Sequence, residues 1–399
     1  MPEAPEDGTQ NVTARLWMDL VKECLTLTKR QQTLASGVLC VLILGSFAVA
    51  GLWPFHSPVN GVSWAANQDG VQMHEHALIL STGALSGSVD GSCSVSMWLR
   101  TGSKEDSTAL LSFYGPEGGI GLSLHRSLTD LRLDRQIHLT RTAKMYVDRI
   151  LPNGRRRFLT VVSSPRGTAI YVDGILVRQS AGFVSSRGDC SGRFVVGDSP
   201  RGHGSWQGEV RGLAVYNREL PAAAVMRTYR SWRASGRPEE VVAGRPDVLY
   251  LFDERQGRRI IDHGTAGVDL VIPERYASAV PTLLQSPLSA FEVEWSYVAD
   301  IIINIGGFVP FGLVLSVFLA SLGRFKRVAT MTVAGGLMVS LTIEVLQFYL
   351  PTRNSDLTDV LTNTLGTWLG AVVWRRWVCQ WIREPMASVG EGTPRARSS

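Results

Sequence analysis

The chain has 399 residues, of which 45% are hydrophobic and 19% are charged. Its mean hydropathy of +0.07 is too polar for a wholly membrane-embedded transporter and too apolar for a purely soluble enzyme, so we expect a soluble domain joined to membrane helices. The net charge of +5 is small and scattered along the chain, which argues against a nucleic-acid partner. The five cysteines form no CxxC or Cys/His cluster with zinc spacing, so we predict no metal site from them.

The first part of the chain predicts a cytoplasmic segment followed by a membrane helix. Residues 1–33 are polar, and the run RLWMDLVKECLTLTKR within them fits either a helix on the membrane surface or a charged helix without a partner. Residues 34–53 are an uncharged apolar run of about the ~20 residues that cross a bilayer. The A-V-A tripeptide at 48–50 also resembles a signal-peptide cleavage site. The long leader and the W-P-F ending at 53–55 favour a retained anchor instead.

Residues 58–290 have a different texture, because short alternating runs of apolar and polar residues are separated by Gly, Asp, Asn and Pro. Runs of this kind at regular spacing are typical of an all-β sandwich. The clearest is IYVDGILV, in which Asp173 and Gly174 supply the positive-φ turn of a two-residue hairpin. We therefore predict an all-β domain here.

Four segments carry a resemblance to a known fold: SVSMWLR, RFLTVVSSPRGTAIYVDGILVR, FVVGD and SWQGEVRGLAVYNRELPAAAV. Together they resemble the concanavalin A-like, laminin-G-like jelly-roll sandwich over residues 58–235. We interpret residues 236–290 as appended strands followed by a connector. The resemblance implies the fold and leaves the function open, because this fold hosts lectins, glycosidases, adhesion modules and spacers.

The sandwich lacks the signature of a glycosidase. Glycosidases of this fold carry paired carboxylates in an E-x-D-x-x-E-like run, and a retaining mechanism needs two carboxyl groups roughly 5 Å apart. The sandwich has no such run, and the nearest pair, Glu292 and Glu294, lies outside it. A non-catalytic binding domain is therefore the better interpretation.

Binding of a sugar or another polymer stays open, with Asp198, His203 and Trp206 as the candidate ligand loop. A sheet-packing role for Trp206 fits the sequence equally well. Asp189 and Asp198 are weak candidate ligands for a calcium ion, because single carboxylates in loops are usually solvated. We predict no other cofactor.

Two of the five cysteines, Cys93 and Cys190, fall within the predicted sandwich. If the sandwich faces an oxidising compartment, these two residues are the candidates for a disulfide. The sequence leaves the bonded and the free forms open.

Three further apolar spans follow the sandwich, at residues 297–322, 327–350 and 356–376, and a tail occupies residues 377–399. Tyrosine and tryptophan stand near the ends of these spans, as expected for residues at a membrane surface. Pro310 predicts a kink in the second span of the chain, whose freed carbonyl neighbouring helices would satisfy.

The basic residues predict one orientation of the spans, because cytoplasmic loops carry an excess of Lys and Arg. They cluster before the first span, between the second and the third, and after the fourth. Both termini are therefore predicted to be cytoplasmic and residues 54–296 extracytoplasmic, in a multi-pass membrane protein. The residues that set this orientation are Lys22, Lys29, Arg30, Arg324, Lys326, Arg327, Arg375 and Arg376.

The spans after the sandwich also carry ionisable and amide side chains, which are costly beside hydrocarbon and mark a functional or a structural site. Spacings of three and four residues place them on single helix faces. They either lock the helices together or form an outward-facing pocket for a lipid head group. This candidate membrane polar site consists of Asp300, Asn304, Glu344, Gln347, Arg353, Asp356, Asp359 and Asn363.

These polar residues stand within three longer patterns: N-x-x-x-F-x-P-F-G from Asn304, S-x-x-x-E-x-x-Q from Ser340, and P-x-R-x-x-D-x-x-D-x-x-x-N-x-x-G-x-x-x-G from Pro351. Over residues 297–375 the patterns resemble the VanZ-like membrane family, whose first helix ends in L-x-P-F, as residues 34–55 do here. Small residues let helices approach closely. The helix-packing positions of the patterns are Pro310, Gly312, Gly366 and Gly370.

The resemblance implies a multi-domain fold in which a jelly-roll sandwich is inserted between the first two helices of a four-helix transmembrane bundle. The family is named for reduced susceptibility to the glycopeptide teicoplanin, which implies a role in the cell envelope. The first hypothesis is a non-catalytic envelope protein whose sandwich binds a polysaccharide or a protein. The alternative is a membrane enzyme that acts on a membrane lipid or a lipid-linked envelope precursor through Glu344, Asp356 and Asp359. A transporter is disfavoured by the absence of an internal repeat.

Overall fold

The computed structural model describes residues 28–387, apart from 67, 103–106, 117, 139–140, 203, 239–243, 286–294 and 324–326. Several sequence interpretations fall outside these residues: the amphipathic N-terminal run, the tail from residue 388 on, the basic residues 324 and 326, His203 and the carboxylate pair at 292–294. The chain forms two compact units. One holds the long helices, up to residue 55, at 283–349 and from 354 on, and the other holds residues 56–282 with 350–353.

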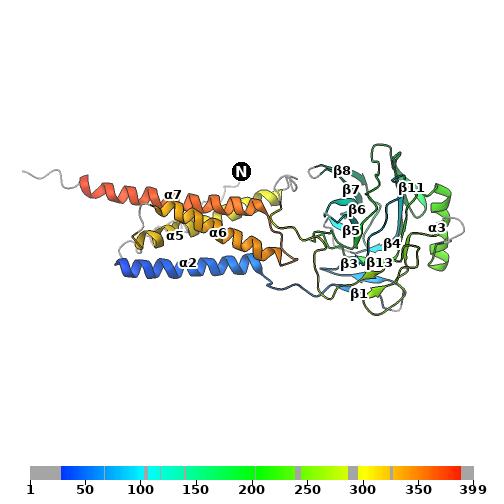
Figure 1. Cartoon of the computed structure of the whole chain (residues 1–399), viewed down its shortest axis with the longest axis horizontal. Helices are drawn as coiled ribbons and strands as arrows, with labels where there is room; N and C mark the ends of the chain where they lie inside the picture. The colour runs from blue at the N-terminus through cyan, green and yellow to red at the C-terminus, as the bar shows by residue number, and fades with distance from the viewer. Residues whose placement is uncertain are drawn as a thin grey trace, which may run out of the picture. The chain divides into compact units, whose positions relative to one another are not determined.

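The second unit is a sandwich of two antiparallel sheets, each eight-stranded (Figure 1). The first sheet has the order β1 (Val62–Trp64), β2 (Val71–Met73), β13 (Gly208–Tyr216), β4 (Cys93–Thr101), β9 (Arg156–Ser164), β10 (Gly167–Val172) and β11 (Ile175–Ser180), with β14 (Val248–Tyr250) paired to β13. The second has the order β15 (Arg259–Ile260), β16 (Leu270–Val271), β3 (Ile79–Ser81), β12 (Arg193–Val196), β5 (Thr108–Tyr114), β6 (Ile120–Ser127), β7 (Asp130–His138) and β8 (Arg141–Val147).

Alternation along the strands builds the core between the two sheets. On β4, Val95, Met97 and Leu99 are at most 1% exposed and belong to the main core cluster. Trp98 points to the other face of the same strand and packs on a second cluster, because successive side chains of a strand point to opposite faces. The predicted hairpin is confirmed: β10 and β11 pair across Asp173 and Gly174, which both have positive φ.

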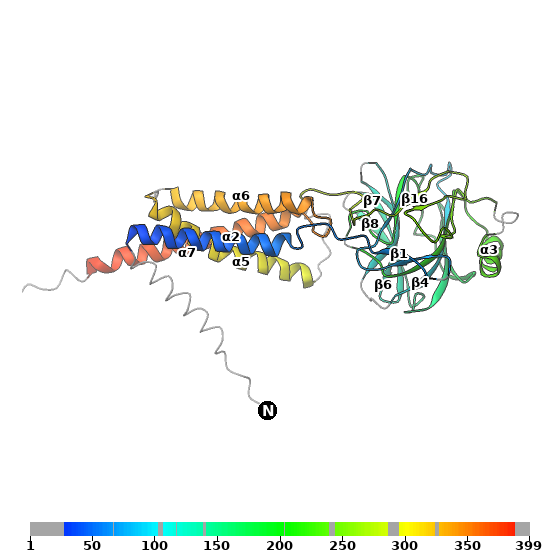
Figure 2. The same ribbon diagram turned by 90° about the horizontal axis from the view of Figure 1, so that it is seen from below.

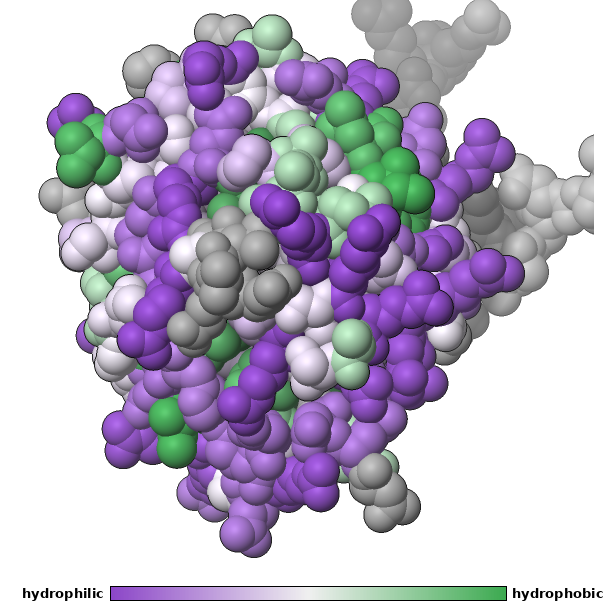
Figure 3. All heavy atoms as spheres, turned by 90° about the vertical axis from the view of Figure 1, so that its right-hand side faces the viewer, coloured by the Kyte–Doolittle hydropathy of each residue, from purple (hydrophilic) through white to green (hydrophobic). Residues whose placement is uncertain are grey.

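Helix α3 (Ala222–Ser235) covers the outer face of the first sheet, and Figure 3 shows this mainly hydrophilic face of the molecule. The helix buries Val225 and Trp232 against side chains of β9 and β13. It ends at Gly236, which adopts the left-handed conformation that glycine accepts most easily. A Cβ atom at Gly212 of β13 would lie 1.6 Å from the ring of Trp232, so only glycine allows this ring to lie against the sheet.

The structure joins Cys93 and Cys190 in a disulfide. Cys93 begins β4 in the first sheet, and Cys190 precedes β12 in the second. Both residues are 3% exposed. The disulfide therefore connects the two sheets through the interior of the sandwich, across 97 residues of sequence.

The first unit contains four long helices: α2 (Lys29–Leu52), α5 (Trp295–Ser321), α6 (Val328–Phe348) and α7 (Leu357–Ala387). Two views show them running alongside one another (Figures 1 and 2). Among the described residues, three helical segments are long and apolar enough to cross a membrane: Arg30–Leu52, Val298–Ser321 and Val328–Phe348. The predicted fourth span, within α7, is not among them. Threonine, aspartate and asparagine residues dilute the apolar composition of α7.

Glycines set the close contact between α5 and α7. A Cβ atom at Gly366 would lie 2.4 Å from the carbonyl oxygen of Ile305, and one at Gly370 would lie 2.3 Å from that of Val309. From the other side, Gly312 faces the backbone of α7 in the same way. The predicted packing glycines thus lie where two backbones touch. Pro310 lies within α5, and the helix continues through it.

Candidate functional site

Three carboxylates of the polar site come together at the start of α7: Glu344 is buried, and Asp356 and Asp359 are half-buried. Glu344, near the end of α6, is 1% exposed, and its Oε2 accepts a hydrogen bond of 2.8 Å from the backbone N–H of Asp356. Asp356 stands just before the helix and accepts from the backbone N–H of Thr358, also at 2.8 Å. Carboxylates at this position satisfy free backbone donors and meet the positive end of the helix dipole. The pair therefore anchors α7 to α6.

Two amide side chains link α7 to its neighbours further along. Asn304 of α5 donates from Nδ2 to Oδ1 of Asp359 at 2.9 Å. Asn363, one turn beyond Asp359, donates from Nδ2 to the Ser340 hydroxyl of α6 at 2.9 Å. The predicted stripe on α7 is therefore shared between two partner helices.

Three predicted members of the site differ from this pattern. Gln347 of α6 donates from Nε2 to the carbonyl oxygen of Gly51 at 3.1 Å, so it connects α6 to α2. Asp300 is exposed, one turn before Asn304. Arg353 falls in the sandwich unit, so its place in the polar site stays a prediction.

The chemistry open to this cluster is limited by how its groups are bonded. Glu344, Asp356 and Asp359 all accept hydrogen bonds from the helix bundle. Acid–base catalysis by a carboxylate requires it to lie within hydrogen-bond reach of a substrate. Buried acceptor oxygens of Gln347 and Asn363 have no partner among the described residues. These hydrogen bonds connect α7 to α6 through Glu344 and to α5 through Asp359.

Two members of the candidate ligand loop, Asp198 and Trp206, are both 0% exposed. Trp206 precedes β13 and fills the core between the sheets. Asp198 accepts a hydrogen bond of 2.5 Å from the Tyr276 hydroxyl and two more from the backbone N–H groups of Ser199 and Gly204. Burial raises the pKa of Asp198 to about 6. Both side chains therefore hold the fold, and neither can reach a ligand in the loop.

Asp189, the other candidate calcium ligand, is 5% exposed. Its Oδ2 accepts from the backbone N–H of Ser186 at 2.6 Å and from Arg135 at 3.4 Å. Burial raises the pKa of this carboxyl group. Asp189 and Asp198 thus each accept hydrogen bonds from the backbone of their own loop.

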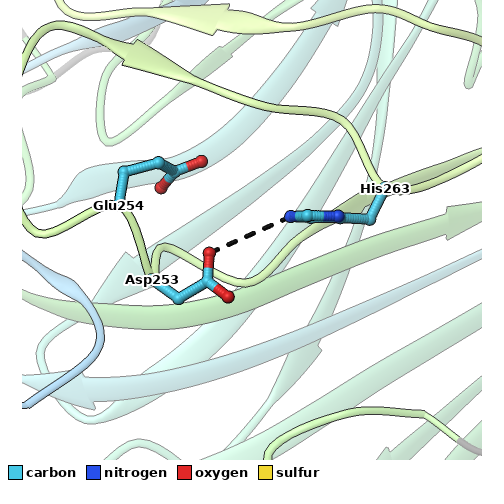
Figure 4. Close-up of side chains that lie close together, drawn as sticks. All are labelled: Asp253, Glu254 and His263. Carbon is cyan, nitrogen blue, oxygen red and sulfur yellow. Dashed lines mark ion pairs between the residues drawn. The ribbon is translucent and has the colours of Figure 1, made fainter.

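A cluster that the sequence did not reveal lies after β14, where possible ligand atoms of Asp253, Glu254 and His263 are within 4.8 Å of one another (Figure 4). Nε2 of His263 is 3.9 Å from Oδ1 of Asp253. Glu254 also accepts from the backbone N–H of Ile261 at 2.7 Å. The D-E pair and the histidine nine residues later were the only signal in the sequence. The spacing of the three residues matches neither a helical nor a strand period, so it does not predict that they lie close together.

Two family models match the chain. Residues 67–226 match the concanavalin A-like lectin/glucanases superfamily. Residues 251–380, from just after β14 into α7, match VanZ/LLP1. The chain thus contains a concanavalin A-like domain and a VanZ-like domain.

One curated relative is "Protein VanZ" from Enterococcus faecium, which is 39% identical over 71 residues. That match covers 18% of this chain and 41% of the relative, so the chain spans less than half of its length.

Solved structures also match the chain. A putative carbohydrate binding protein from Bacteroides ovatus has 13% identity and a TM-score of 0.38, with 51% of this chain and 57% of that chain covered. A SAP-like pentraxin from Limulus polyphemus has 14% identity and a TM-score of 0.36, with 54% and 95% covered. TM-scores below 0.5 do not establish a shared fold, so the sandwich assignment rests on the strand order and on the family model.

The buried Asp198 predicts a dependence of sandwich stability on pH. Its folded-state pKa of about 6 lies above the ordinary aspartate value of 3.8, so the folded protein holds the proton more tightly than the unfolded chain does. The resulting stabilisation is complete below about pH 4 and is lost as the pH rises through about 6, by roughly 3 kcal/mol. Asp198→Asn removes this loss. Amide exchange of β12 in the full-length protein at several pH values measures it.

An exposed aspartate, in Asp148→Asn, serves as the control and should leave the pH profile of the wild type unchanged. If wild type and Asp198→Asn lose the same free energy of unfolding between about pH 4 and about pH 7, Asp198 does not carry the effect.

Two substitutions of Glu344 that are similar in size should differ in their effect on stability. Glu344→Gln keeps an oxygen that accepts from the Asp356 N–H, so it should stay within about 1 kcal/mol of the wild type. Glu344→Leu leaves that buried donor unpaired and should cost about 1–3 kcal/mol. Amide exchange in the first turn of α7, in detergent-solubilised protein, reports the change. Equal destabilisation by both substitutions would contradict the anchoring role.

Proposed function

The chain carries a VanZ-like domain and a concanavalin A-like sandwich, and from this combination we propose an envelope protein that is not an enzyme. It is an integral membrane protein of the bacterial cell envelope, and its sandwich is a binding domain on the outer side of the membrane. The ligand class is an envelope polysaccharide or an envelope protein. The similarity to a protein named VanZ supports the envelope assignment and a link to glycopeptide susceptibility.

The observation that carries the non-catalytic part of the proposal is the bonding of the three carboxylates at α7. Glu344, Asp356 and Asp359 accept hydrogen bonds from backbone or amide groups of the bundle. A membrane enzyme would need at least one of them to meet its substrate. Their bonding instead supports a bundle that serves as a rigid membrane anchor.

The proposed architecture has four transmembrane helices with the sandwich inserted between the first and the second. In chain order, α2 precedes the sandwich, and α5, α6 and α7 follow it. In this proposal α7 crosses the membrane despite its polar residues, because these residues face α5 and α6 rather than lipid. In this proposal both termini lie in the cytoplasm and residues 54–296 lie outside, which the clusters of basic residues before α2, between α5 and α6 and within α7 support.

The alternative is a membrane enzyme that acts on a lipid-linked envelope precursor. The observation in its favour is the grouping of Glu344, Asp356 and Asp359 at one end of the bundle, where a lipid head group would lie. The same grouping would serve a non-catalytic contact with membrane lipid.

The binding role is tested with full-length protein in lipid nanodiscs against purified envelope polysaccharides. Wild type and Glu344→Gln should bind equally, since the substitution keeps the anchoring hydrogen bond. A chain in which residues 58–282 are replaced by a short linker should insert into the membrane and lose binding. If Glu344→Gln folds and binds normally but abolishes a cellular phenotype of the gene, the enzyme hypothesis replaces the proposal.

The topology is tested by cysteine labelling of intact cells with a membrane-impermeant reagent. In a background of Cys24→Ser and Cys379→Ser, Ser103→Cys should react from outside. Phe325→Cys, between α5 and α6, should react only after lysis. Labelling of position 325 in intact cells would overturn the orientation.

A further inference from the structure

A pocket of about 480 Å³ opens at the C-terminal end of α3, on the outer face of the first sheet. Its lining comes from segments far apart in the sequence: Trp98 of β4, Arg211 of β13, Trp232 and Arg233 of α3, and the loops that hold Arg237 and Asp253. This volume lies in the range of pockets for small ligands. None of its lining residues belongs to the loop at residues 198–206 that the sequence suggested as a ligand site.

Positive charge exceeds negative charge on the pocket walls. Arg211, Arg233 and Arg237 line it together with two carboxylates, those of Asp69 and Asp253. The carboxylate of Asp69 already pairs at 2.9 Å with a further arginine outside the lining set. The pocket therefore favours a ligand that carries an anion.

The three arginines differ in how far their donors are occupied. Arg211 pairs with Glu209 at 2.9 Å, and Arg237 lies 3.4 Å from Asp253. Arg233 is exposed and forms no ion pair with another described residue. It lies in the last turn of α3, where the negative end of the helix dipole favours a cation, and its exposed guanidinium can donate to a ligand.

The surroundings of Arg211 also favour an anionic ligand. Its side chain is 23% exposed, and burial, followed by the charge of neighbouring Arg156, lowers its pKa. A cation that is disfavoured by its surroundings gains from an additional anion nearby. An anionic ligand in the pocket would therefore stabilise the charged form of Arg211.

Two tryptophans and Leu251 form the apolar part of the pocket wall. Trp232 is 4% exposed and lies against Gly212, and its indole N–H has no acceptor among the described residues. Trp98 is half-buried and stacks with Tyr229, with 6.3 Å between ring centroids. Indole rings offer flat apolar surface with one polar donor, which suits the apolar face of a sugar ring beside its hydroxyl groups.

We propose that this pocket binds an anionic saccharide, a polyhydroxylated ring that carries a carboxylate or a phosphate. In this arrangement Arg233 and Arg237 contact the anion, Trp98 contacts the ring, and Asp253 accepts from ring hydroxyls. This inference rests on the proposed function, because it assigns the ligand class and the location of the binding that the sandwich performs in the envelope.

The test is isothermal titration of the full-length protein in nanodiscs with four probes: glucuronic acid, glucose 6-phosphate, glucose and inorganic phosphate. The first two distinguish a carboxylate from a phosphate as the anion. At least one of them should bind ten-fold or more tightly than glucose and than inorganic phosphate. Equal affinity for glucose would overturn the role of the anion. Inorganic phosphate binding as tightly as the sugar would overturn recognition of the ring.

The matched variants are Arg233→Gln and Arg230→Gln, which change the same residue type on the same helix. Only Arg233 lines the pocket, and both side chains are exposed. Arg233→Gln should weaken binding about ten-fold, and Arg230→Gln should leave it unchanged. Equal effects of the two variants, or no binding of any probe at millimolar concentration, would overturn the proposal.

Binding of polysaccharide by the sandwich and binding of a ligand in the pocket are distinguished by these experiments. If full-length protein binds a purified envelope polysaccharide and Arg233→Gln does not alter that binding, the pocket is not the binding site and the binding role stands. If the protein binds the small anionic saccharide but no polysaccharide, the pocket stands and the ligand named under the proposed function is wrong.

Discussion

The helical unit depends on how one buried carboxylate is paired. Glu344 stands in apolar surroundings where an unpaired charge or an unpaired backbone donor is costly, and it is paired with the first free N–H before α7. With that end of α7 fixed, the amide contacts of Asn304 and Asn363 fall on successive turns. The same helix then approaches α5 closely enough that Gly366 and Gly370 cannot be larger. The polar hydrogen bonds set the position of α7 along its neighbours, and the glycines set the distance between α7 and α5.

Much of this arrangement could be predicted from spacing, because a helical stripe and a hairpin turn are local properties. The hairpin at Asp173 and Gly174 and the packing glycines of α7 follow directly from residue type and period. The partners of the stripe could not be predicted. Asp359 and Asn363 share one face of α7, and yet one bonds to α5 and the other to α6, which depends on how three helices pack. Helix α7 also continues to Ala387, past the end of the predicted span at residue 376, because a helix can extend beyond the apolar stretch that marks a span.

In the sandwich, by contrast, residues that the sequence suggested were exposed are buried. Asp198 and Trp206 stand in a glycine-rich stretch that is typical of an exposed loop, but the glycines there allow close packing, and both side chains are buried. Sequence alone does not separate a loop that contacts solvent from one that folds back into the core. The pocket beside α3 was missed for a related reason. Its walls come from β4, β13, α3 and a later loop, and no single segment contains a recognisable pattern.

Gly212 controls the position of one wall of the pocket from beneath it. The residue does not line the pocket, but the Trp232 ring lies where its Cβ atom would be. A single methyl group at this position on β13 would lift the tryptophan, and with it the end of α3, away from the sheet. The width of the pocket thus depends on a residue that lies beneath its wall and does not line it. Related chains could change the size of the ligand that they accept through a strand residue that never contacts it.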